Sequence, residues 1–208
     1  MKTPLIASLA LASLICATQT LAAGEEVQGM QVAKGSALSG DGNTVTMKGN
    51  ALPLSGQGIK VGDPLPSAVV TAGNLSPVNL GDATGKVRII SVVPSVDTPT
   101  CEAQTHALSE KDRKLAEQVD MVTISMDLPF AQSRFAREAK IKNVTFLSDY
   151  KTAAFGLNNG LLIEPLRLLA RAVIVTDKDN VVRYIQVVPE LTSLPDMAAA
   201  MNAAKALM

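Results

Sequence analysis

A strand, helix, strand pattern in the middle of this chain constrains its fold more than any other feature. Residues 86–93 (KVRIISVV) form an apolar, β-branched run, and residues 121–126 (MVTISM) form a second one. Between them, residues 100–118 show the apolar spacing of a helix. Such a unit builds a sheet with helices packed on it, so the pattern predicts an α/β domain.

The flanking segments continue this alternation. A helix is predicted over residues 130–140, with Asp127 and Pro129 as capping signals. The other expected elements are a hairpin of residues 44–48 and 51–54 joined by Gly49 and Asn50, a strand over 144–147, an antiparallel pair over 171–176 and 181–188 around the turn 177–180, and a closing helix over 194–207. Together they predict a mixed central sheet flanked by helices, of the thioredoxin-like kind, preceded by an N-terminal hairpin.

The first residues have the pattern of a cleavable signal peptide. Lys2 precedes an apolar run from Leu5 to Ala17, and small residues follow at Ala22, Ala23 and Gly24. We therefore predict a signal peptide over residues 1–23, a flexible leader over 24–43 and one domain over 44–208. The protein is expected to be exported, to the periplasm of a Gram-negative source and otherwise to the medium. A lipid-attached Cys16 is the less favoured alternative, because such sites need a small residue where Ile15 stands.

Charge excludes some classes of partner. The chain has 19 basic and 19 acidic residues, and cleavage after residue 23 would remove one lysine, leaving 18 against 19. A net charge near −1, without basic runs, argues against a nucleic-acid partner. No later segment is apolar enough to act as a membrane anchor, so no membrane association is expected after signal cleavage.

Once the signal peptide is removed, Cys101 is the only cysteine. Thr98 and Pro99 are typical of the first positions of a helix, which places the thiol in the first turn, where the helix dipole favours a thiolate. Cys101, Leu108 and Leu115 are seven residues apart, so the sulfur should face inward. The alternative is an inert core cysteine. The position of Cys101 at a helix start, together with the expected oxidising compartment, favours a reactive thiol over an inert core cysteine.

Several thiol chemistries are excluded by the neighbouring residues. The one histidine, His106, would be turned roughly 140° away from Cys101 on the same helix, which argues against a Cys-His hydrolase. Ala107 stands where a phosphatase loop needs arginine, and Thr98 stands where a Cys-x-x-Cys motif needs its first cysteine. One cysteine and one histidine are too few for a metal site. We therefore expect no metal or cofactor, and a single thiolate that attacks an electrophile such as a peroxide.

The residues around Cys101 resemble those of a known family. Pro94-x-x-x-Thr98-x-x-Cys101 is similar to the active-site pattern of the peroxiredoxins. The stretches SVDTPTC (95–101), DLPFAQSRF (127–135) and LLARAVIV (168–175) resemble the bacterial thiol peroxidase branch of that family. The resemblance extends from Thr44 to the C-terminus.

The resemblance implies roles for four residues. Cys101 would be the peroxidatic cysteine, which becomes a sulfenic acid, and Thr98 would hydrogen-bond the thiolate and the peroxide. Pro94 would shield the site from water, and Arg171 would stabilise the thiolate and polarise the peroxide. Without the resemblance, the favoured interpretation of Arg171 would be a strand-end residue in a surface ion pair, and Thr98 could equally be only a helix cap. Arg134 could line the site or a solvated helix face.

One position departs from the family pattern. In this branch DLPFAQSRF is commonly followed by a resolving cysteine, and here Ala136 stands in that place. The resemblance therefore implies a one-cysteine cycle that needs an external thiol reductant, either a thioredoxin-like protein or a small thiol. It also implies a homodimer and a hydrogen peroxide or organic hydroperoxide substrate. A peroxide sensor without fast turnover and a structural or binding descendant of the family stay open as alternatives.

Overall fold

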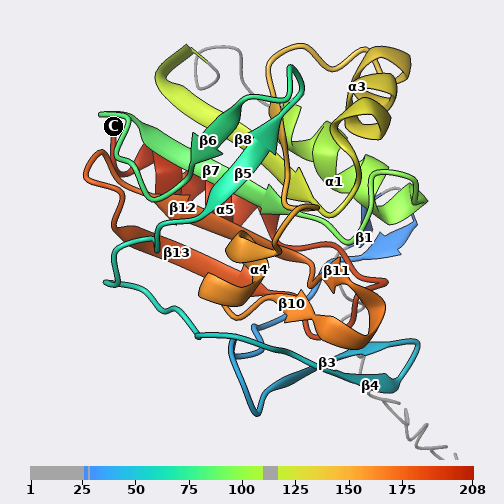
Figure 1. Cartoon of the computed structure of the whole chain (residues 1–208). Coiled ribbons are helices and arrows are strands. Elements are labelled where there is room, and N and C mark those ends of the chain that lie inside the picture. Colours follow the sequence, from blue (N-terminus) through green and yellow to red (C-terminus); the bar gives the residue numbers. More distant parts are fainter. Residues whose placement is uncertain (1–25, 28, 110–116) are drawn as a thin grey trace, which may run out of the picture.

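The structure is a computed structural model that describes residues 26–27, 29–109 and 117–208 (Figure 1). The predicted signal peptide, with Cys16, and Leu115 lie outside the described residues, so the signal peptide and the inward direction of Leu115 stay predictions.

A seven-stranded sheet forms the centre of the domain. Its middle strands β7, β8 and β9 run parallel, and the strands outside them pair antiparallel. This confirms the mixed sheet, including the antiparallel pair β12–β13. In spatial order the strands are β13 (Val182–Val187), β12 (Ala172–Thr176), β7 (Val87–Val92), β8 (Val119–Ser125), β9 (Thr145–Ser148), β5 (Val69–Ala72) and β6 (Pro77–Asn79).

Helices cover both faces of this sheet. One face packs against α1 (Pro99–Ser109), α3 (Pro129–Glu138) and α5 (Met197–Lys205). The other carries α4 (Ala154–Asn158), the short strands β10 (Leu162–Ile163) and β11 (Leu168–Leu169), and the 3-10 turn Glu164–Leu166 between them (Figure 1). No helix among the described residues has the length and apolar character needed to cross a bilayer.

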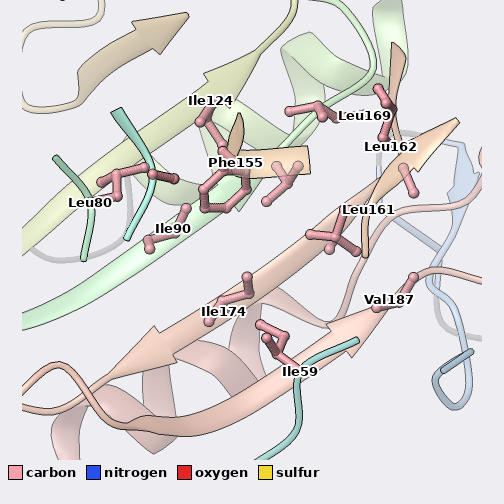
Figure 2. Packing of buried hydrophobic residues seen from close by; sticks show 14 of the residues in the cluster. Ile59, Leu80, Ile90, Ile124, Phe155, Leu161, Leu162, Leu169, Ile174 and Val187 are labelled. Carbon is pink, nitrogen blue, oxygen red and sulfur yellow. The ribbon is translucent and has the colours of Figure 1, made fainter. Parts of the chain in front are cut away.

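Each central strand is buried on both sides because its alternate residues enter two different cores. In β12, Ile174 joins the cluster on the α4 side, while Val173 joins the cluster on the α1 side. Figure 2 shows Phe155 of α4 in the middle of the first cluster, among Leu80 and Ile124. Full burial of such a side chain stabilises the fold by roughly 1.5 to 3 kcal/mol, so α4 anchors that face although it is short.

The N-terminal hairpin is confirmed, with β3 (Thr44–Met47) pairing antiparallel with β4 (Asn50–Pro53). Before it, β1 (Glu26–Val27) pairs with β2 (Met30–Gln31), and the chain then follows the outer edge of β13. There the amide of Ala37 donates to Val187 O at 2.8 Å. The described part of the expected leader thus contacts the sheet, while the boundary between leader and domain stays a prediction.

Glu190 joins the hairpin to the loop that follows β13. Its carboxylate accepts hydrogen bonds from the hydroxyl of Thr46 at 2.8 Å and from the backbone amides of Lys48 and Gly49 at 2.9 and 3.1 Å. Burial acts to raise the pKa of this carboxyl, but the hydrogen bonds outweigh it and lower the pKa to about 2. The hairpin therefore holds the loop of residues 189–194 in place.

Two predicted helix starts are wrong in detail. The residue that caps α3 is Leu128, which makes no side-chain cap hydrogen bond, so Asp127 is not the cap although Pro129 opens the helix. The closing helix begins at Met197 rather than residue 194, because Pro195 disfavours helical backbone at the residue before it and Asp196 caps Ala199 N at 2.8 Å. Of the helix predicted over residues 100–118, the structure describes α1, which ends at Ser109.

Asp149 gives the fold a pH dependence that can be measured. Its carboxylate is buried beside α4 and accepts hydrogen bonds from the amides of Phe155 and Gly156. Burial raises the pKa of this carboxyl from 3.8 to about 6, against the opposing effect of those hydrogen bonds. Because the folded state holds this proton more tightly than the unfolded state, the stabilisation is complete below pH 3.8 and is lost as the pH rises through 6.

We expect the free energy of unfolding to lose about 2 to 3 kcal/mol from this group across that window. Urea titrations at several pH values between 4 and 7 measure it, with Asp149→Asn as the control because the amide does not titrate. Parallel pH curves for the two proteins would contradict the prediction.

Candidate active site

The end of β7 and the start of α1 bring Cys101 into the core. Pro94 follows β7 and is buried, and residues 94–98 form a loop that leads into α1 at Pro99. Thr98 caps the helix, because its carbonyl accepts from Glu102 N at 3.0 Å and its hydroxyl lies 3.4 Å from Cys101 N. The thiol of Cys101 lies within the cluster on the α1 side and is 0% exposed. The inward direction predicted from the helical spacing is therefore confirmed for Cys101.

Arg171 reaches the sulfur because of the register between two strands. β12 runs antiparallel to β7, and Ala172 pairs with Val92. The residue immediately before β12 therefore lies beside the end of β7, where the loop to α1 begins. From there Arg171 Nη2 approaches Cys101 Sγ at 3.5 Å, and the whole residue is only 2% exposed.

The guanidinium of Arg171 is fixed by two further hydrogen bonds. Its Nε donates to Leu191 O at 3.0 Å, in the loop that Glu190 ties to the hairpin. Its Nη1 donates to Gln104 Oε1 at 2.7 Å, and the amide nitrogen of Gln104 donates to Ser91 Oγ at 2.8 Å. Gln104 was not singled out from the sequence. The available signal was its position three residues after Cys101, which puts both side chains on one face of the helix.

Two hydrogen-bond donors and a helix N-terminus surround the sulfur. The hydroxyl of Thr98 donates to Cys101 Sγ at 2.9 Å, and the N-terminal end of α1 adds its positive dipole. Burying a guanidinium is unfavourable unless a negative charge accompanies it. Among the described residues, the other hydrogen-bond partners of Arg171 are the neutral oxygens of Leu191 and Gln104, so Cys101 is its one partner with an ionisable side chain.

The structure thus brings three of the predicted site residues, Thr98, Cys101 and Arg171, into hydrogen-bond contact, and Pro94 is buried at the start of the same loop. Arg134 is not among the contacts of the sulfur. It bonds to Asp97 at 3.1 Å, in an ion pair of which both side chains are more than half exposed. Such exposed pairs contribute little to stability. Of the two interpretations for Arg134, the solvated helix face fits the geometry.

An open hollow of about 390 Å³ lies next to the loop. It is lined by residues 96–99 and Glu102 on one side, and on the other by Phe135 and Glu138 of α3 and by Ala139, which follows that helix. Thr98 therefore lies between the buried sulfur and this hollow. The hollow offers a small molecule an approach to the site from the loop side.

The chain is similar over most of its length to proteins of known families. The family model described as Redoxin matches residues 60–201. Thiol peroxidases of Halalkalibacterium halodurans and Bacillus subtilis are 47% and 44% identical over 165 and 164 residues, each covering 79% of this chain and 99% and 98% of the relative. A solved peroxiredoxin-like protein from Aquifex aeolicus superposes with a TM-score of 0.76 at 41% identity, covering 84% of this chain and 100% of that one.

These similarities identify the fold and the family of the chain. The structural match confirms the predicted thioredoxin-like fold, with its mixed sheet between helices and its small N-terminal hairpin. The chain therefore belongs to the thiol peroxidases, which are peroxiredoxins of the redoxin family.

Proposed function

We propose that this thiol peroxidase reduces hydrogen peroxide and organic hydroperoxides with Cys101 as its nucleophile, through a cycle that uses one cysteine. The observation that carries the proposal is the position of Cys101 Sγ, which is 2.9 Å from the hydroxyl of Thr98 and 3.5 Å from Arg171 Nη2. A buried sulfur between two donors suits a thiolate that attacks an oxygen on which negative charge develops.

In the first step the Cys101 thiolate attacks the terminal oxygen of the peroxide. The S–O bond forms as the O–O bond breaks, so the sulfur loses two electrons and the peroxide gains them. The leaving alkoxide, or hydroxide from hydrogen peroxide, takes a proton from water, and Cys101 is left as a sulfenic acid. Thr98 and Arg171 donate hydrogen bonds to the peroxide oxygens without losing their own protons, and Pro94 limits access of water.

The second step needs a thiol from outside the chain. Ala136, half-buried on α3, stands where the related branch commonly has a resolving cysteine, and the chain's other cysteine, Cys16, belongs to the proposed signal peptide. An external thiol would attack the sulfenic sulfur, giving a mixed disulfide and water. A second thiol would then release Cys101 and leave as the other half of a disulfide. A thioredoxin-like protein or a small thiol fits this role.

Stopped-flow oxidation of the protein by cumene hydroperoxide tests the proposal. We expect Cys101 to be oxidised far faster than free cysteine, and one equivalent of a small thiol per chain to form a mixed disulfide. Further thiol should restore the reduced protein. Oxidation no faster than that of free cysteine would overturn the proposal. Fast oxidation that no thiol reverses would instead favour the peroxide sensor.

We also propose that the protein is exported, since residues 1–23 have the signal-peptide pattern. A homodimer is proposed as well. The exposed side chains of Leu128 and Phe130, at 50% and 66%, offer apolar surface near the site, and sedimentation equilibrium would measure the association.

A further inference from the structure

We propose that Asp127 is a positioning residue that holds the loop of residues 94–98 closed over Cys101, and so sets the balance between the two half-reactions. The inference rests on the proposed peroxidase cycle. It starts from an unexpected observation, that the side chain of Asp127 does not cap α3 but turns towards the loop before α1.

The carboxylate of Asp127 makes two direct hydrogen bonds to this loop. Its Oδ2 accepts from Val96 N at 2.7 Å, and its Oδ1 accepts from Ser95 Oγ at 2.9 Å. Among the described residues, the other polar side-chain contacts of the loop to residues outside it are the exposed ion pair of Asp97 with Arg134 and the hydrogen bonds of Thr98 with Cys101. Hydrogen bonds to a charged acceptor are stronger than neutral ones. Asp127 is therefore the main polar anchor of the loop that carries Thr98.

Asp127 is itself held by rigid parts of the sheet. Ser125 Oγ, at the end of β8, donates to its Oδ2 at 2.7 Å, and Ser148 Oγ, at the end of β9, donates to its carbonyl oxygen. Gln132 Nε2 donates to both Ser125 Oγ and Leu147 O. Ser125, Gln132 and Ser148 are fully or almost fully buried. Through the carboxylate of Asp127, the ends of β8 and β9 therefore fix the position of the loop.

The two half-reactions place opposite demands on this loop. Oxidation needs the loop closed, because only then does the hydroxyl of Thr98 lie 2.9 Å from Cys101 Sγ. Reduction needs it open, because the sulfur is 0% exposed and an external thiol must reach it in line. Loss of the Asp127 anchor should therefore slow the first half-reaction and speed the second. A general loss of stability would not separate them in this way.

The test compares Asp127→Ala and Asp127→Asn with wild type and with Asp177→Ala. Asp177 is a matched control, since its carboxylate also fixes a loop, through Val181 N and Asp179 N, but at the turn between β12 and β13. Three quantities are measured: the rate constant of Cys101 oxidation by cumene hydroperoxide, the rate constant of reduction of the sulfenic acid by 2-mercaptoethanol, and the hydrogen exchange of the backbone amides of residues 95–98. Urea unfolding gives the stability of each variant.

For Asp127→Ala we expect oxidation about tenfold slower, reduction several-fold faster and faster amide exchange, as the loss of one to two net hydrogen bonds predicts. Asp127→Asn should lie between this variant and wild type, because its amide oxygen can still accept from Val96 N and its amide nitrogen can donate to a serine hydroxyl. Asp177→Ala should leave all three loop measurements unchanged.

Wild-type values for Asp127→Ala would overturn the inference, and so would equal changes in Asp177→Ala or a parallel fall of both rate constants. If wild type is oxidised no faster than free cysteine, the proposed function fails. The exchange data then still decide whether Asp127 holds the loop.

Discussion

Replacing Cys101 by serine is expected to abolish peroxide reduction, lowering the rate of cumene hydroperoxide consumption by at least about 10³-fold. Serine has almost the same shape and can still hydrogen-bond to Thr98 and Arg171. The serine hydroxyl, however, is not ionised near neutral pH and is a poor nucleophile towards a peroxide oxygen. The measurement is peroxide loss with a thiol present, followed for both proteins at equal concentration.

A matched urea midpoint for Cys101→Ser would show that the loss is chemical rather than structural. Because Cys101 is the only cysteine outside the proposed signal peptide, residual fast turnover in Cys101→Ser would mean that the reacting group is not a cysteine thiol. That result would remove the central residue of the proposed mechanism.

Replacing Arg171 by alanine should lower the rate constant of Cys101 oxidation by about 10² to 10³-fold, the usual effect of losing a preorganised donor in an active site. Arg171 is buried and donates to Cys101 Sγ, Gln104 Oε1 and Leu191 O with three different nitrogens. Lysine cannot bind all three, because it carries one ammonium group instead of a planar fork. Arg171→Lys should therefore recover only part of the rate.

The control for Arg171 is Arg183→Lys. Arg183 also binds another side chain, Asp177, but in a partly exposed ion pair away from the sulfur. Stopped-flow oxidation of the three variants, followed at one pH, gives the comparison. Equal rate constants for Arg171→Ala and wild type would show that the guanidinium acts only on the fold.

Hydrophobic periodicity predicted the inner strands and the long helices because these segments bury whole faces. It missed β5, β6 and α4, which are three to five residues long. At this length apolar residues identify an element only in some cases, as they did for the equally short β9. Phe155 illustrates the difficulty, since nothing local marks the central aromatic of the core. Its burial depends on which distant segments pack around it, and a local pattern does not contain that information.

The candidate site also contains some residues that local sequence patterns could predict and others that they could not. Thr98, Pro99 and Cys101 are neighbours in sequence, so the helix start and the buried thiol could be predicted locally. Arg171 enters through the pairing of β12 with β7, and only the family resemblance pointed to it. Asp127 was assigned to the helix that follows it, because an acidic residue before Leu-Pro is typical of a helix start. In the folded protein the backbone amide of Val96 binds this carboxylate instead.

The edges of the central sheet also limit how this protein can associate. On one side, residues 32–37 lie along β13, where Ala37 N donates to Val187 O and Ser36 Oγ accepts from Val187 N. On the other side, β6 is three residues long and begins with Pro77, which has no amide hydrogen to offer. Neither edge therefore presents a full row of free backbone N–H and C=O groups with which another strand could pair. Two copies of the chain would therefore have to meet through side chains. A shortened chain that starts at the hairpin would uncover the end of β13 at Val187, while residues 62–63 would still cover its start at Val182.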